Sequence, residues 1–151
     1  MPLILLKLVH ITAAIVAVGA NVTYAAWLGA AGRDRDRLRF AIDTIRWIDH
    51  RIALPGYIVV LLTGLGMVVT GFYVFGAPGS GWLEIALLLY VVTAVLGFHD
   101  FAPALRSQAE EAANDPSSAA YAAAAARTRL LSAVTTGIVA VIVFLMVVKP
   151  F

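Results

Sequence analysis

Four long apolar stretches, separated by segments rich in charge or glycine, set the pattern of this sequence. They cover about residues 3–28, 52–75, 82–101 and 130–148. A helix needs about 20 mostly apolar residues to cross the hydrocarbon core of a bilayer, and all four stretches meet this length. Because lipid offers no partner for open backbone groups, each stretch should be helical. The pattern predicts an all-α integral membrane protein with four transmembrane helices.

The amino-acid composition supports the same class of protein. Hydrophobic residues make up 62% of the 151 residues and charged residues only 13%, whereas a soluble domain has about a quarter charged residues. The length allows one domain, residues 1–151. The sequence has no cysteine, which excludes disulfides, thiolate zinc sites, cysteine-bound iron–sulfur clusters and cysteine nucleophiles.

The connections between the stretches differ sharply in charge. Residues 29–51 contain six arginines and residues 102–129 contain three, whereas residues 76–81 have no charge. Cytoplasmic loops of membrane proteins carry the excess of Lys and Arg. We therefore expect both long connections in the cytoplasm and both termini outside. The net charge of +2 fits anionic lipid headgroups and not nucleic acid.

The two cytoplasmic connections should continue as helix beyond the membrane. Asp115 followed by Pro116 is typical of a helix start, and the alanines of residues 119–126 should extend the fourth helix. Pro55 and Pro103 should kink or restart their helices near the inner face. The first connection has apolar residues at helical spacing, namely Leu38, Ile42, Ile45 and Ile48. The expected fold is an antiparallel four-transmembrane-helix bundle with its helix ends extended into the cytoplasm.

Polar side chains inside the apolar stretches indicate which faces pack together. On the first stretch a polar stripe follows one helical face, formed by Lys7, His10, Asn21 and Tyr24. The other stretches offer Gly, Ser and Thr, which let helices approach closely and hydrogen-bond. Because ionisable groups within a membrane are expensive and often functional, the stripe is the first candidate site.

His10 is the candidate ligand within the membrane. It lies about two turns, roughly 10 Å, inside the outer boundary, where an imidazole could bind haem iron or another transition metal. Met67 and Tyr90 lie near the same depth and are the other candidate cofactor-binding residues. His10 with Met67, His10 alone and His10 paired across a dimer all stay open. The alternative is a structural histidine that hydrogen-bonds Tyr90, a threonine or a backbone carbonyl.

The remaining ionisable residues give weaker candidates. His50 and His99 each neighbour an aspartate, but the expected helix register separates them by roughly 12 Å along the axis, too far to share a metal ion. Glu84 is expected to pair with Lys7 or Lys149 at the outer surface. The sequence has no Gly-rich phosphate loop, nucleophile–base arrangement or nucleic-acid motif. No residue is predicted to be catalytic, and an enzyme is the less expected outcome.

Three motifs give the sequence a resemblance to a known family. They are the opening KLVH motif of residues 7–10, the LPG and LTG motifs of residues 54–56 and 62–64, and the closing FLMVVKP motif of residues 144–150. With them the chain resembles a bacterial family of four-helix integral membrane proteins of unknown function. The opening around His10 is also distantly similar to copper-resistance membrane proteins of the D type and to J-type protoporphyrinogen oxidases, which are haem-associated.

Two functions from different classes follow from the sequence. The first is a small b-type haem-binding or redox-associated membrane protein, with His10 as the axial ligand. The second is a cofactor-free accessory or scaffold subunit that packs on itself or on a larger membrane complex. A transporter is a third class, but so few polar groups at mid-depth would require an oligomer.

Overall fold

The computed structural model describes residues 2–151, and all regular structure within them is helical. The elements follow in the order α1 (Pro2–Ala31), α2 (Arg35–Ile48), η1 (Asp49–Ala53), α3 (Leu54–Val69), α4 (Gly81–Leu96), η2 (Gly97–Phe101), α5 (Ala102–Asn114) and α6 (Ala119–Val148). The segments η1 and η2 are π-helical, and the helix continues through each of them. As a result α2–η1–α3 is one helix of 35 residues, and α4–η2–α5 is one helix of 34 residues. Four helices are thus long and apolar enough to span a membrane, which confirms the predicted number.

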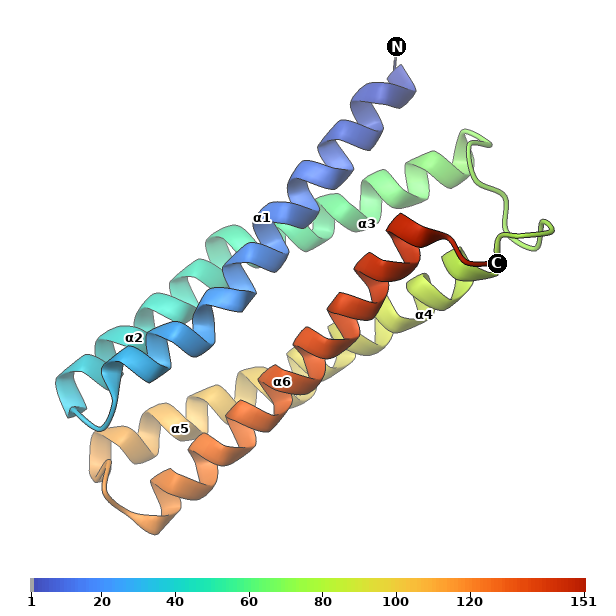
Figure 1. Cartoon of the computed structure of the whole chain (residues 1–151). Coiled ribbons are helices and arrows are strands. Elements are labelled where there is room, and N and C mark those ends of the chain that lie inside the picture. The colour runs from blue at the N-terminus through green and yellow to red at the C-terminus, as the bar shows by residue number, and fades with distance from the viewer. Residues whose placement is uncertain (1) are drawn as a thin grey trace.

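The four long helices form two pairs (Figure 1). Helix α1 packs along α2 and α3, and α6 packs along α4 and α5. We name the end that holds residues 32–34 and 115–118 the turn end, where α2 also contacts α5. The opposite end holds residues 70–80, and we name it the loop end. A helix of 35 residues is about 50 Å long, so about 20 Å of it extends beyond a hydrocarbon core of about 30 Å.

The most deeply buried side chains gather at the turn end. Leu38, Ile42 and Ile45 of α2 are at most 1% exposed, as their spacing predicts. Two clusters surround them, one formed by Ala31, Leu38, Ala41, Ala112 and Tyr121, the other by Tyr24, Ile42, Ile45 and Leu105. Residues of α1, α2, α5 and α6 thus share one core at this end. Along the rest of the molecule most large apolar side chains are exposed, as expected of helices that face lipid.

The loop end is closed by aromatic rings and by the residues that follow α6. Lys149 donates from Nζ to the Tyr73 hydroxyl at 2.8 Å and lies 5.0 and 5.3 Å from the ring centroids of Tyr73 and Trp82. The carbonyl of Phe151 accepts from the Trp82 N–H at 3.4 Å, and a Cβ added at Gly81 would lie 3.2 Å from the Phe151 ring. Lys149 of the closing motif and Phe151, the residue after the motif, therefore hold the end of α6 against the start of α4.

The expected ion pair of Glu84 with Lys7 or Lys149 is wrong. The Glu84 carboxylate accepts from the backbone N–H of Gly76 at 2.7 Å, while Lys149 binds Tyr73. Within the described chain, the side-chain ion pair that the structure shows joins Arg127 and Asp100, whose N and O atoms lie 4.0 Å apart.

The start of α6 lies later than the sequence indicates. Ser118 is its N-cap and accepts from the Tyr121 N–H at 3.0 Å. Asp115 accepts instead from the backbone N–H and the hydroxyl of Ser117, at 2.8 and 2.6 Å, and these bonds lower the pKa of the Asp115 carboxyl. Two polar residues three positions apart can both cap a helix, and the structure uses the second.

The π-helical segments lie where each long helix leaves the turn-end core. In both, the N–H that follows the segment bonds to the carbonyl five positions back, that of Asp49 in η1 and that of Gly97 in η2. Pro55 and Pro103 come directly afterwards and lack the N–H that a regular α-helix uses. The sequence predicted a kink or restart at these prolines, and the structure instead widens one turn of an unbroken helix.

A glycine allows α1 and α3 to meet at close range. A Cβ added at Gly56 would lie 3.0 Å from the Cβ of Ala17, which is fully buried. Farther along the same interface, Gly66 lies beside Leu6 and Gly64 beside His10. These contacts run in opposite directions along the two helices, and they set the register that brings His10 level with Thr63.

The substitution Gly56→Leu should destabilise the protein, because a side chain at this position must displace Ala17. Overpacking of this kind typically lowers the free energy of unfolding by about 1–3 kcal/mol, which titration of the detergent-solubilised protein with a denaturing detergent would measure. The matched control is Gly19→Leu on α1, where an added Cβ meets nothing within 4 Å. Equal stability of the two variants would contradict the close approach of α1 and α3.

Gln108 should be an unfavourable residue in the turn-end core. Its side chain is 3% exposed, and its Oε1 has no hydrogen-bond partner in the part of the chain that the structure describes. A buried acceptor without a partner costs about 1–3 kcal/mol. We therefore expect Gln108→Leu to raise the free energy of unfolding, and Ser107→Leu, at the exposed neighbouring position, to leave it nearly unchanged. A destabilised Gln108→Leu variant would mean that the amide is satisfied.

Candidate functional site

The imidazole of His10 is held by a hydroxyl on the neighbouring helix. Its Nδ1 lies 2.9 Å from Oγ1 of Thr63. The Thr63 hydroxyl itself donates to the backbone carbonyls of Val59 and Val60, at 2.6 and 3.2 Å. When the Thr63 hydroxyl gives its one proton to a carbonyl of its own helix, its oxygen is left to accept from the Nδ1–H of His10. The network thus assigns the proton of the neutral ring to Nδ1 and leaves the lone pair on Nε2.

This contact joins the opening motif to the LTG motif. Thr63 supplies the hydroxyl that binds Nδ1, and a Cβ added at Gly64 would lie 3.4 Å from Cε1 of His10. Glycine therefore leaves room for the edge of the ring. The sequence identified both motifs, but the 53 positions between His10 and Thr63 hid their pairing, which only the register of α1 on α3 determines.

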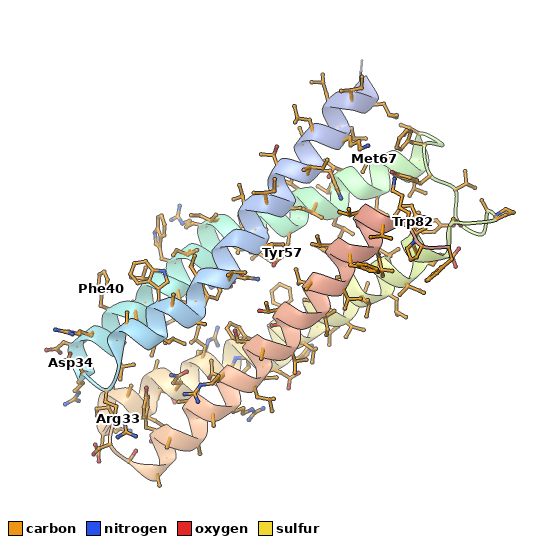
Figure 2. All side chains as sticks on the ribbon, viewed as in Figure 1. Arg33, Asp34, Phe40, Tyr57, Met67 and Trp82 are labelled. Atoms are coloured by element: carbon orange, nitrogen blue, oxygen red, sulfur yellow. The ribbon has the colours of Figure 1, made fainter. Side chains whose placement is uncertain are left out.

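The structure separates Met67 and Tyr90, the other two candidate cofactor-binding residues. Met67 is buried and lies one turn, about 6 Å, nearer the loop end than Thr63. Tyr90 lies at the level of Tyr57, where its hydroxyl donates to the Tyr57 carbonyl at 2.8 Å. Figure 2 shows Tyr57 near the middle of the molecule and Met67 closer to the loop end. The Tyr90 hydroxyl is thus hydrogen-bonded to α3 and does not bond to His10.

The inner part of the polar stripe forms a second group of contacts, which we name the amide–tyrosine cluster. Asn21 donates from Nδ2 to the Tyr57 hydroxyl at 2.6 Å, and the Tyr24 hydroxyl donates to Oδ1 of Asp49 at 3.1 Å. The rings of Tyr57 and Tyr90 meet edge to face, with centroids 6.5 Å apart. The cluster consists of Asn21, Tyr24, Asp49, Tyr57 and Tyr90.

The polar stripe therefore divides into two sites. His10 and Asn21 are 11 positions apart on α1, which corresponds to about 16 Å. Lys7 is exposed and lies one turn beyond His10 toward the loop end. Tyr57 and Asp49 were not among the site residues predicted from the sequence. The available indication was that both place a polar group at the edge of, or within, an apolar stretch.

A shared metal site at the other histidines has no support in the geometry. His50 of η1 and His99 of η2 are both exposed. Residues 2–151 contain no group of three or more His, Asp or Glu side chains that could hold a metal ion. Asp100, next to His99, faces Arg127 instead.

A groove of mixed charge lies between α2 and α5 at the turn end. Its volume is about 600 Å³, and Arg35, Arg39, Asp36, Asp43 and Glu110 contribute its charged lining. The guanidinium of Arg35 also donates to the backbone carbonyl of Ala113, which ties the two helices together. Because the charges nearly cancel, the groove does not select an anion or a cation.

The comparisons with known proteins agree with this architecture. A family profile described as "Predicted integral membrane protein (DUF2269)" matches residues 4–150. Searches of curated proteins and of solved structures gave no match. The comparisons therefore add no support for the more distant likeness to copper-resistance proteins and protoporphyrinogen oxidases. Since the profile covers nearly the whole chain, the protein belongs to this family of integral membrane proteins of unknown function.

Proposed function

We propose that this is a small b-type haem-binding membrane protein, associated with electron transfer, in which His10 binds the iron through Nε2. The observation that carries the proposal is the hydrogen bond of His10 Nδ1 to Thr63. Histidines that bind metals almost always donate their other ring N–H to an oxygen, which fixes the tautomer and the orientation of the ring. Thr63 does this from the neighbouring helix and leaves Nε2 with its lone pair.

His10 would be the one iron ligand that each copy of the chain contributes. A Cβ added at Gly64 would lie only 3.4 Å from Cε1 of His10, so this edge of the ring lies against α3 and a macrocycle would have to lie outside the interface of α1 and α3. This contact argues against Met67 of the same chain as the second ligand. A haem would therefore be held by His10 of one copy, or by His10 of two copies of the chain.

Each residue has a distinct part in this proposal. Bound haem would supply one-electron chemistry. His10 would bind the iron through Nε2. Thr63 would make the ring a stronger ligand by accepting a hydrogen bond from its Nδ1–H. The hydrogen bonds from Thr63 to its own backbone hold the hydroxyl in the orientation that accepts. The surrounding apolar helices would exclude water and favour a hydrophobic macrocycle.

The proposal includes an orientation of the antiparallel bundle in a bacterial inner membrane. The six arginines of residues 29–51 lie in the turn before α2, in α2 and in η1, and the three of residues 102–129 lie in α5 and the first half of α6. These segments form the half of the molecule toward the turn end (Figure 1). By the positive-inside rule, the turn end faces the cytoplasm and both termini face outward. His10 then lies in the outer half of the membrane.

A second candidate function is an accessory or scaffold subunit without a cofactor. It is favoured by the face of α6 that is exposed on the surface of the bundle. Four small residues on this helix are exposed, namely Ala133, Thr136, Gly137 and Ala140. A Cβ added at Gly137 would meet nothing within 4 Å. Small residues at spacings of three and four let transmembrane helices pack closely, so this face suits a helix of another copy or of a larger complex.

The haem proposal predicts a stoichiometric Soret band in protein purified from haem-replete cells in mild detergent. We expect the band to sharpen on reduction with dithionite and to be lost in His10→Ala. In Thr63→Val, haem should bind about 10–100-fold more weakly and show a higher midpoint potential, because a less electron-rich imidazole stabilises ferric iron less. Ser132→Ala, which changes a partly buried hydroxyl on α6, is the control. Colourless wild-type protein after haem supplementation would disprove the proposal.

The accessory-subunit candidate predicts association through α6. Energy transfer between donor- and acceptor-labelled copies in liposomes should be specific in the wild type and should fall in Gly137→Leu, because the side chain would hold the helices apart. Val141→Leu, at an exposed apolar position of the same helix, should have no effect. Equal energy transfer in all three proteins would show that copies of the chain do not associate through this face of α6.

A further inference from the structure

One end of the Asn21 amide is unsatisfied. Nδ2 donates to the Tyr57 hydroxyl at 2.6 Å, whereas Oδ1 is buried and has no hydrogen-bond partner in the described chain. The hydrocarbon core of a bilayer offers no water to replace the missing bond. Such a group in a native protein calls for an explanation, and a bound water or ligand is one of the few available.

Turning the amide does not remove the unsatisfied group. The oxygen and nitrogen of an amide are assigned from the hydrogen bonds, and 2.6 Å falls in the usual range for O–H···O, below the usual range of about 2.7–3.2 Å for N–H···O. With the amide turned, Tyr57 would donate to the carbonyl oxygen and the NH₂ group would be left alone. In both orientations a buried polar end of Asn21 faces the same position.

Aromatic rings from both helix pairs belong to the same cluster. The ring planes of Tyr57 and Tyr90 cross at 70°, and both side chains are only partly buried. No Cα atom of α3 lies within 8 Å of a Cα atom of α4 or α6 in residues 2–151. The two helix pairs are therefore joined here by side chains and not by close backbone packing.

The position lies inside the hydrocarbon. Tyr57 is 12 residues from the end of α3 at Val69, which corresponds to about 18 Å of a core about 30 Å thick. A molecule that reaches the site from the side would therefore come from the lipid phase. The cluster also contains one carboxylate, that of Asp49, which is hydrogen-bonded to Tyr24.

We propose that the amide–tyrosine cluster binds the hydroxyl head of a neutral, lipid-soluble molecule, of the alkylphenol or long-chain alcohol class. A hydroxyl both donates and accepts, so it satisfies Asn21 in either orientation. A carbonyl or an ether oxygen only accepts. An anionic head would be repelled by Asp49, and any charged head is disfavoured at this depth. The aromatic rings then lie along the first part of the apolar tail.

This inference is independent of haem at His10, which lies about 16 Å away along α1. It assigns a ligand to residues that the haem proposal does not use. The variant His10→Ala should therefore keep the behaviour described next, so failure of one proposal can be told from failure of the other.

The test compares a long-chain alkylphenol with its methyl ether, which has the same tail and ring but no hydroxyl proton. Both are titrated into the full-length protein in nanodiscs of zwitterionic lipid, and thermal unfolding is followed. We expect the phenol to raise the unfolding temperature saturably and to bind at least about fivefold more tightly than the ether, as expected for one net hydrogen bond.

The variants Asn21→Leu and Tyr57→Phe should abolish the preference for the phenol. Tyr57→Phe removes one hydroxyl and keeps the ring, so it tests the site even if Asn21→Leu does not fold. Thr93→Val is the control, since the Thr93 hydroxyl bonds only to the Leu89 carbonyl of its own helix. If water alone fills the position, the phenol gains nothing over the ether in the wild type, and the proposal is wrong. It is equally wrong if both variants keep the preference.

Discussion

The burial of α2 at the turn end is the contact on which the rest of the architecture depends. Lipid tails are as apolar as leucine, so transmembrane helices gain no hydrophobic drive to leave lipid for one another. Burial from water can act only where the helices extend beyond the hydrocarbon. Leu38, Ile42 and Ile45 lie in this region and are almost completely shielded. Four helices are thus clamped at one end by a core of the water-soluble kind.

Within the membrane, close packing and a few hydrogen bonds must hold the helices together in place of burial from water. The approach of Gly56 to Ala17 sets the register of α1 on α3, and this register pairs His10 with Thr63. The two helix pairs meet through Tyr90 and the carbonyl of Tyr57. Each polar contact therefore has a positional role, which is also what a ligand site requires. The same geometry that orients the Asn21 amide leaves its other, buried end without a partner in the described residues.

The sequence predicted the parts of the fold that depend on local pattern. Apolar runs predicted the four spans, and the spacing of Leu38, Ile42, Ile45 and Ile48 predicted an amphipathic helix, but not that its apolar face packs on the other helices. It could not give the partner of His10, because several threonines lie at similar depth and only packing chooses among them. Tyr57 was missed because an aromatic residue in an apolar stretch looks like ordinary core. The start of α6 was misplaced because Asp115 and Ser118 are both good caps.

The contact of Phe151 with the start of α4 has a consequence for assembly. Ser80 precedes α4 but makes no side-chain cap, and the carbonyl of Phe151 receives the N–H of Trp82 instead. In the order of synthesis, α4 enters the membrane long before residues 149–151 exist. Its first turn therefore lacks this hydrogen bond until α6 has been inserted and residues 149–151 have folded back onto α4. The first turn of the third span is thus completed last, after the fourth span is in place.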